Sequence, residues 1–146
     1  MRWPPRYLRG LSWCTRGDAT SWVFACLRRC AQNTAMKFLD PDTESAVRTF
    51  LARLPAELRL QYAILYGSRA RGEDRPDSDA DLALILAEGE GDWQLVGSLA
   101  ELAYDVFLER GVLIQPVPIS LMHWLNPERF PRPGFLRNVA RDGIVL

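Results

Sequence analysis

Two short apolar runs in the middle of the chain constrain its fold more than any other feature. Residues Gln61–Tyr66 form a β-prone run that stops abruptly at Gly67-Ser68, and Asp79–Leu86 forms a second run whose distal half is almost wholly apolar. A strand that is apolar on both sides has to lie inside a sheet that is covered on both faces. The sequence therefore predicts a sheet that contains these two segments as inner strands.

Three helical patterns can supply the cover for this sheet. Asp40 can cap a helix that ends at Pro55, Asp92 can cap a longer helix that ends at Gly111, and a third pattern is closed by Gly143. The residues predicted to face the core are Val47, Phe50, Leu51 and Leu54 in the first helix, Val96, Leu99, Ala103, Val106 and Phe107 in the second, and Phe135, Leu136, Val139 and Ala140 in the third. These spacings are typical of amphipathic helices that pack against a sheet.

A third strand is predicted over Val112–Ser120, and two prolines restrict its neighbours. Pro116 and Pro118 both remove an amide from the same side of the strand, so only one of its edges can pair fully. Ser120 can cap a short turn, and a proline-broken loop follows at Asn126–Pro133. The order helix, strand, strand, helix, strand, helix predicts an α/β (α+β) fold, a small mixed sheet with flanking helices.

Length, composition and charge exclude several classes of protein. The 146 residues are 48% hydrophobic, with 18 basic and 18 acidic side chains, which excludes intrinsic disorder and a strongly basic nucleic-acid binder. No apolar run reaches the roughly 18 to 20 residues needed to cross a bilayer, so no membrane contact is expected. All three cysteines fall in the first 35 residues, and a reducing, cytoplasmic setting is expected.

Residues 1–35 differ from the rest of the chain and are predicted to be a poorly ordered or non-core leader, ahead of a domain over residues 36–146. They hold six arginines, one acid and three of the five tryptophans, without a sustained helical or strand period. Three interpretations compete: an Arg-rich transit peptide, a signal peptide centred on Trp22–Leu27, or a natural translation start at Met36. The change in composition near Met36 favours the last. Cys26 and Cys30 alone do not complete a zinc site.

The residues that carry chemistry are concentrated between positions 65 and 82. A Gly67-Ser68 turn between a strand and a helix leaves backbone amides free, and the missing Cβ of Gly67 lets a phosphate approach closely. Asp79 and Asp81 lie at i and i+2 of a strand, so their carboxylates share one face, where mutual repulsion favours a cation such as Mg²⁺. Each feature alone is more often a plain turn or a solvated strand end.

Taken together, the two features resemble a known superfamily. Ten residues separate Ser68 from Asp79, and the polymerase-β-like nucleotidyltransferases have an apolar-Gly-Ser turn followed by Asp-x-Asp on the next strand. The run Gly-Ser-Arg-Ala-Arg-Gly followed by Ser-Asp-x-Asp-Leu resembles the minimal (MNT-type) branch of that superfamily. The specific motif covers residues 67–82, and a looser resemblance in element order covers about residues 40–146.

The resemblance implies a polymerase-β-like nucleotidyltransferase fold and an activity. A nucleoside monophosphate would pass from a nucleotide triphosphate to an acceptor hydroxyl, and pyrophosphate would leave. Gly67 and Ser68 would hold the phosphates, while Asp79 and Asp81 would be the catalytic residues that bind Mg²⁺. The expected substrate is ATP, and the protein mainly positions and stabilises the reacting groups.

Two arginines follow the turn and carry two alternative roles. Arg69 and Arg71 can offer guanidinium donors to nucleotide phosphates, as nucleotide-binding residues. They can equally pair with the nearby acids of the loop, which are Glu73, Asp74 and Asp77. The sequence leaves both roles open.

The third strand departs from the family pattern. Active members usually carry a third carboxylate there, but Leu113–Val117 places Gln115 at the corresponding position. An amide oxygen can ligate a metal weakly, yet it cannot serve as a base or supply charge. Asp105 and Glu109 are interpreted as the solvated face of the preceding helix, and His123 is assigned no role. The nucleotide-binding half of the site is therefore predicted to be intact, while the half that activates the acceptor lacks its acid.

Two classes of function follow from this reading. The first is a working nucleotidyltransferase, which most resembles antitoxins that transfer AMP to a helical HEPN-type ribonuclease as partner. The second is a catalytically weak module that masks a partner by contact. About 110 residues leave no room for the second domain of antibiotic-modifying enzymes, and no basic groove or aromatic platform indicates direct contact with nucleic acid.

Overall fold

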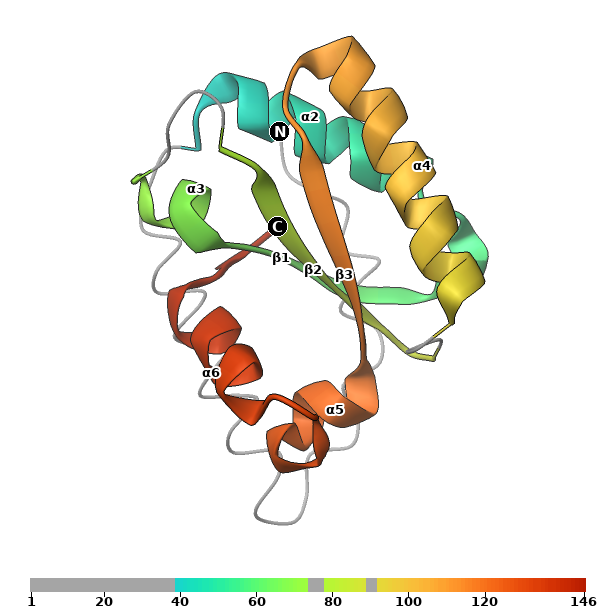
Figure 1. Ribbon diagram of the computed structural model, residues 1–146, viewed down its shortest axis with the longest axis vertical. Helices are drawn as coiled ribbons and strands as arrows, with labels where there is room; N and C mark the ends of the chain where they lie inside the picture. The colour runs from blue at the N-terminus through green and yellow to red at the C-terminus, as the bar shows by residue number, and fades with distance from the viewer. Residues whose placement is uncertain (1–38, 74–77, 89–91) are drawn as a thin grey trace.

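A four-stranded mixed sheet forms the centre of the domain (Figure 1). The computed structural model describes residues 39–73, 78–88 and 92–146. The strand order is β3-β2-β1-β4, with β1 at Leu60–Tyr66, β2 at Ala80–Leu86, β3 at Ile114–Ser120 and β4 at Ile144–Val145. Strand β1 is antiparallel to β2 and β4, whereas β2 and β3 are parallel. The two apolar runs are the two inner strands, as the sequence predicted.

Helices cover both faces of the sheet (Figure 1). The helices are α2 (Pro41–Arg53), α3 (Gly67–Arg71), α4 (Trp93–Arg110), α5 (Leu121–Leu125) and α6 (Pro133–Asp142), with short 3₁₀ turns at Ala56–Leu58 and Pro127–Arg129. On β2, Leu82 and Leu84 pack with the helices α2 and α4, while Ala83 and Ile85 pack with α5 and α6. This alternation follows from the two-residue period of a strand, and it explains why β2 is apolar on both sides. The predicted fold class is confirmed.

The predicted caps set the starts of three helices. The carboxylate of Asp40 accepts hydrogen bonds from two backbone amides at the start of α2, and that of Asp92 accepts one at the start of α4. The hydroxyl of Ser120 caps α5 in the same way. Gly111, with φ of 75°, ends α4, because glycine adopts this left-handed conformation without the steric cost of a Cβ.

Strand β3 lies at an edge of the sheet, as its two prolines require. In the β2–β3 register, Pro116 lies opposite Leu82 and Pro118 opposite Leu84. Among the described residues only β2 pairs with β3, so the missing amides interrupt no second ladder there. On the other edge, β4 was not predicted, because a strand of two residues carries no periodic signal.

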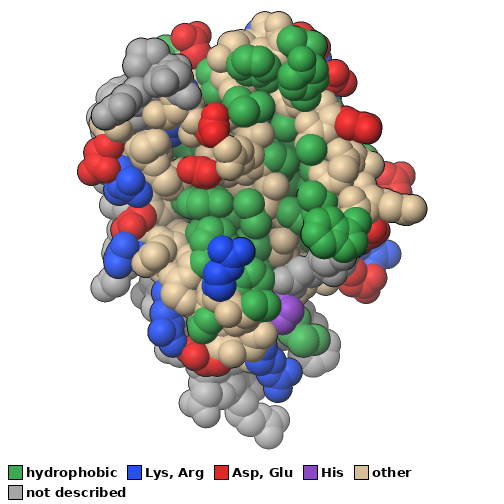
Figure 2. All heavy atoms as spheres, viewed as in Figure 1, with side chains coloured by type: hydrophobic (Ala, Val, Ile, Leu, Met, Phe, Trp, Pro, Cys, Tyr) green, Lys and Arg blue, Asp and Glu red, His purple; other side chains and the backbone are tan. Residues whose placement is uncertain are grey.

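The predicted buried stripe of α4 is too wide. Leu99, Ala103 and Val106 are buried, but Val96 and Phe107 are 38% and 37% exposed. At 100° per residue, Val96 and Phe107 are both rotated to the same side of the stripe that the three buried residues form. They therefore lie at the edge of the packed face and remain partly exposed. Figure 2 shows hydrophobic side chains on the surface along this part of the molecule.

The leader and the membrane are the subjects of two further predictions. The predicted leader at residues 1–35, with all three cysteines, lies outside the described residues. Among the helices that the structure describes, none combines the length and hydropathy needed to span a membrane.

Candidate active site

The topology of the sheet brings the predicted site residues to one place. Strand β1 ends where the antiparallel β2 begins, so Tyr66 lies opposite Asp81. Strand β3 is parallel to β2, so its start also lies there, with Gln115 opposite Asp81. The Gly67-Ser68 turn follows β1 directly. In Figure 2, acidic side chains lie over the end of the sheet where β2 and β3 begin.

Gly67 is required by a close contact as well as by its backbone conformation. Its φ is +79°, and a Cβ added at this position would lie 2.2 Å from Oδ2 of Asp81. The carboxylate of Asp81 thus occupies the space above the turn that any side chain at position 67 would fill. The sequence predicted a close approach of phosphate at Gly67, and the described atoms place a carboxylate there.

Asp81 lies in an environment that opposes its charge. Burial raises the pKa of the Asp81 carboxyl, the neighbouring charge of Asp79 raises it further, and Arg71 partly offsets both effects. The phenol of Tyr66 responds in the same way, because burial and the charge of Asp81 raise its pKa to about 12. A cation at this point would relieve the repulsion between the two carboxylates.

Asp79 and Gln115 contact each other directly. The side-chain amide of Gln115 donates a hydrogen bond to Oδ2 of Asp79. The register of β3, with Gln115 opposite Asp81, places Gln115 at the carboxylate pair. Gln115 is exposed, so its amide can turn and offer its oxygen instead of its nitrogen.

Ser68 and Arg71 lie on α3, directly after the turn. Ser68 is half-buried in the first turn of the helix, next to Gly67. Arg71 is exposed and its Nε lies 2.7 Å from a carboxylate oxygen of Glu73. This ion pair is one of the two roles that the sequence left open, and the effect of Arg71 on the pKa of Asp81 places its charge near the carboxylates. Phosphate binding by Ser68 and Arg71 stays a prediction.

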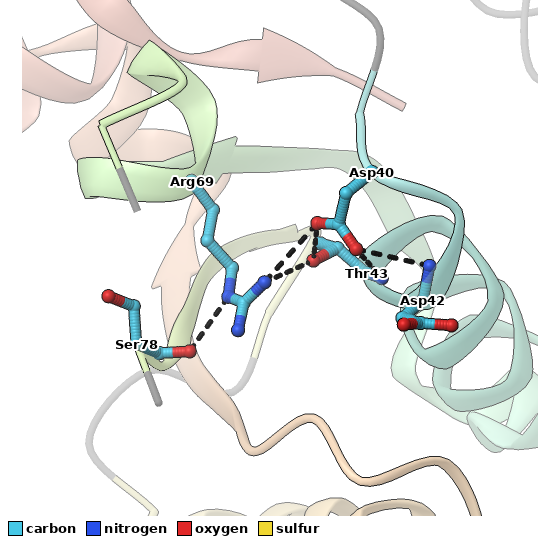
Figure 3. Close-up of polar contacts among 5 residues, drawn as sticks. All are labelled: Asp40, Asp42, Thr43, Arg69 and Ser78. Carbon is cyan, nitrogen blue, oxygen red and sulfur yellow. Dashed lines mark hydrogen bonds and ion pairs between the residues drawn. The ribbon is translucent and has the colours of Figure 1, made fainter. Parts of the chain in front are cut away.

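Arg69 has a different environment from the one that phosphate binding needs (Figure 3). It is 7% exposed. Its Nε donates to the backbone carbonyl of Ser78 at 2.7 Å, and its Nη1 donates to Oγ1 of Thr43 at 2.7 Å and lies 3.2 Å from Oδ2 of Asp40. The guanidinium is directed at α2 and at the segment before β2, so its contacts are structural and we do not carry Arg69 forward as a nucleotide ligand.

Comparison with known proteins assigns the family. Residues 52–146 match the family described as "Polymerase beta, Nucleotidyltransferase". The chain belongs to this nucleotidyltransferase family. No curated protein matches the sequence significantly. A solved structure from Sulfolobus solfataricus, described as a candidate nucleotidyltransferase, covers 90% of this chain and 89% of its own, with 13% identity and a TM-score of 0.36. The family assignment rests on the sequence match alone, and the general role of the domain is nucleotidyl transfer.

The donor set of this nucleotidyltransferase domain suits one class of metal. Members of the family usually use a divalent metal. Among the described residues, no group of three or more His, Cys, Asp or Glu side chains could hold an ion by itself. Asp79 and Asp81 would supply two carboxylates, and Gln115 would supply its amide oxygen once the side chain turns; all of these are hard oxygen donors. Mg²⁺ is held in this way in phosphate-transfer sites, by one or two carboxylates with substrate phosphates and water completing the shell.

Sequence reasoning missed two parts of the site. Tyr66 is the last residue of β1, and its half-buried phenol stays protonated beside Asp81. Its position directly before the Gly-Ser turn was the available signal. The contact of Arg69 with Thr43 joins residues 26 positions apart, and nothing in the local sequence indicates it.

Proposed function

We propose that this domain transfers AMP from ATP to a hydroxyl group of a partner protein, with Mg²⁺ as cofactor. The observation that carries the proposal is the position of the Asp81 carboxylate above Gly67, with Asp79 and Gln115 beside it. In the proposal, the two carboxylates would supply metal-ligating oxygens beside the turn, and the backbone amides of the turn would receive the phosphate. The family match supports nucleotidyl transfer. The use of ATP, Mg²⁺ and a partner protein as acceptor is part of the proposal.

The proposal assigns separate tasks to the two carboxylates, to the Gly67-Ser68 turn and to Arg71. Asp79 and Asp81 would hold Mg²⁺, which neutralises charge on the triphosphate and aligns it. Backbone amides of the Gly67-Ser68 turn would donate to phosphate oxygens, and Arg71 would add a positive charge. The acceptor oxygen forms a bond to the α-phosphorus, the bond to the β-phosphate oxygen breaks, and pyrophosphate leaves while the acceptor loses its proton.

The acceptor side of the site lacks a base. Gln115 lies where a third carboxylate would receive the proton of the acceptor hydroxyl, and an amide cannot take it. The proton has to leave to water or to a group of the partner. General-base help is worth about 10² to 10⁴-fold, so transfer should be slow although nucleotide binds.

The size of the domain and the resemblance of its motif support a protein as acceptor. The described residues form one sheet with its helices, and no second domain for a small acceptor is found among them. The motif over residues 67–82 resembles that of antitoxins paired with a HEPN-type ribonuclease. A toxin–antitoxin antitoxin that acts in the cytoplasm is the setting we propose.

A second function is favoured by Gln115 itself. Its amide donates to Asp79 and so satisfies that carboxylate without a metal. A domain with this arrangement can neutralise a partner by contact, with nucleotide transfer weak or absent. The first proposal and this alternative differ in one observable, which is covalent transfer.

Labelled ATP separates the two functions. The protein is incubated with Mg²⁺, a co-purified helical partner and ATP labelled at the α-phosphate. We expect label on the partner and one pyrophosphate for each label, and ATP labelled at the γ-phosphate should leave the partner unlabelled. A partner that is silenced without label from either nucleotide would contradict transfer and support the binding module. Asp79→Asn serves as the inactive control.

A further inference from the structure

The position of Asp79 is set by contacts outside the sheet. Strand β2 begins at Ala80, so Asp79 precedes the ladder. The carbonyl of Ser78 accepts a hydrogen bond from Nε of Arg69 at 2.7 Å, and the amide of Ala80 donates to the carbonyl of Leu113 at 2.8 Å. These two groups belong to the peptide planes on either side of Asp79. Because peptide groups are planar, fixing both planes fixes φ and ψ of Asp79 and hence the direction of its Cα–Cβ bond, from which the carboxylate extends.

Arg69 is itself anchored at its other end. Its Nη1 donates to the hydroxyl of Thr43, which is fully buried, and pairs with Asp40, the N-cap of α2 (Figure 3). The hydroxyl of Thr43 donates in turn to Asp40. Partial burial raises the pKa of the Asp40 carboxyl, but its hydrogen bonds from Thr43 and the charge of Arg69 outweigh this and lower it. The guanidinium is a fixed spacer between α2 and the peptide that precedes Asp79.

We infer that Arg69 is a positioning residue for Asp79. The inference rests on the proposed function, because it assigns Arg69 a task in aiming a metal ligand. The two hydrogen bonds leave different nitrogens of one planar fork, toward Ser78 and toward Thr43. A lysine carries the same charge on a single nitrogen and cannot reproduce that fork. Asp81 does not depend on Arg69, because its main chain is paired within the sheet.

Calorimetry on the full chain tests this role. Affinity for ATP is measured with and without Mg²⁺ for the parent, Arg69→Met and Arg69→Lys. We expect both variants to lose about 10- to 100-fold in the Mg²⁺-dependent affinity, which is the usual effect of removing a group that orients a metal ligand. Affinity without Mg²⁺ should change little. Arg48→Met is the matched control, because Arg48 is an exposed arginine of α2 that forms an ion pair with Glu44 one turn earlier.

A nuclear magnetic resonance measurement gives a second readout that needs no ligand. The amide of Asp79 shares its peptide plane with the Ser78 carbonyl, so its ¹H–¹⁵N signal should move in Arg69→Met. The amide signal of Asp81 should stay within the shifts that Arg48→Met produces. A structural role alone would spread the changes over both residues.

Three results would overturn the inference. The first is a folded Arg69→Met variant that binds ATP with the Mg²⁺-dependent affinity of the parent. The second is an ATP affinity of Arg69→Met that falls equally with and without Mg²⁺. The third is an Arg69→Lys variant with the full Mg²⁺-dependent affinity of the parent. If the parent shows no Mg²⁺-dependent binding, the proposed function fails, while the Asp79 amide signal still decides the positioning role. Should Arg69→Met not fold, Thr43→Val removes one of the contacts that anchor the guanidinium and keeps its charge, and we expect the same selective loss.

Discussion

The two carboxylates of the site are two residues apart in the sequence but are held in different ways. Asp81 lies within β2, with Tyr66 opposite it on one side and Gln115 on the other. Asp79 precedes the strand. Gln115 donates a hydrogen bond to its carboxylate, and Arg69 donates one to the carbonyl of the preceding residue, Ser78. A residue held by several hydrogen bonds of a sheet keeps its position when one neighbouring side chain is changed. A residue held by single side-chain contacts does not. We call Asp79 with Gln115 and Arg69 the Asp79 side of the site, and Asp81 with Tyr66 and Gly67 the Asp81 side. Of the two, the Asp79 side should respond more strongly to mutation of its neighbours.

The largest effect is expected on the Asp79 side, from Gln115→Asp. A carboxylate at position 115 can accept the acceptor's proton and add a metal ligand, so AMP transfer to a supplied partner should rise by about 10² to 10⁴-fold. Initial rates with α-labelled ATP measure the change, and Gln115→Asn, which keeps the amide, is the control. If the variant and the parent are both inert while the parent silences its partner, the binding module replaces the enzyme.

The Asp81 side can be tested with a pair of glycines. Gly67 and Gly72 both have positive φ, so alanine should cost either position about 1 to 2 kcal/mol of stability. Of the two, only Gly67 would bring the added Cβ against the Asp81 carboxylate, because no atom of the described residues lies within 4 Å of such a Cβ at Gly72. We expect Mg²⁺-dependent ATP affinity to fall about 10- to 100-fold in Gly67→Ala, the scale for displaced metal ligands, and to stay near parental in Gly72→Ala. Equal affinities in the two variants would refute the contact.

The same comparison explains what could be predicted from the sequence. The Asp81 side follows from local signals: an apolar strand, a Gly-Ser turn and the two-residue period of the next strand. Strand order then follows for β3, whose prolines allow only one paired edge. These features depend on residues that are close in the chain.

The Asp79 side depends on contacts between distant segments, which the local sequence does not indicate. The sequence left Arg69 between phosphate binding and pairing with Glu73, Asp74 or Asp77, whereas its partners Asp40 and Thr43 lie 26 to 29 residues earlier. The exposure of Val96 and Phe107 was missed for a related reason, since helical period alone does not give the width of the packed face.

A smaller effect is expected on stability, and it concerns Asp81. Because burial and Asp79 raise the pKa of Asp81 in the folded state, this carboxyl stabilises the fold at low pH. That contribution is lost as pH rises from about 4, the value in the unfolded chain, through the raised pKa. Asp81→Asn should therefore gain stability relative to the parent as pH rises over this range. Urea unfolding at a series of pH values measures it, and a gap that does not widen with pH would contradict the assigned environment.

The smallest effect is expected from removing the leader, which should touch neither carboxylate. A chain that begins at Met36 should melt at the same temperature as the full chain and bind ATP equally well. Thermal melts of the two proteins check this. A loss of several degrees would mean that Trp13 or Trp22 packs on the core, and that the predicted domain boundary is wrong.

The central claim is that Asp79 and Asp81 together form a metal–nucleotide site beside Gly67. Calorimetric titration of ATP with and without Mg²⁺ tests it most directly, in the parent, Asp79→Asn and Asp81→Asn. We predict Mg²⁺-dependent binding in the parent and its loss in both variants, with each fold intact. Unchanged affinity in both variants would show that the pair is only a solvated strand end, and the account of this site would be wrong.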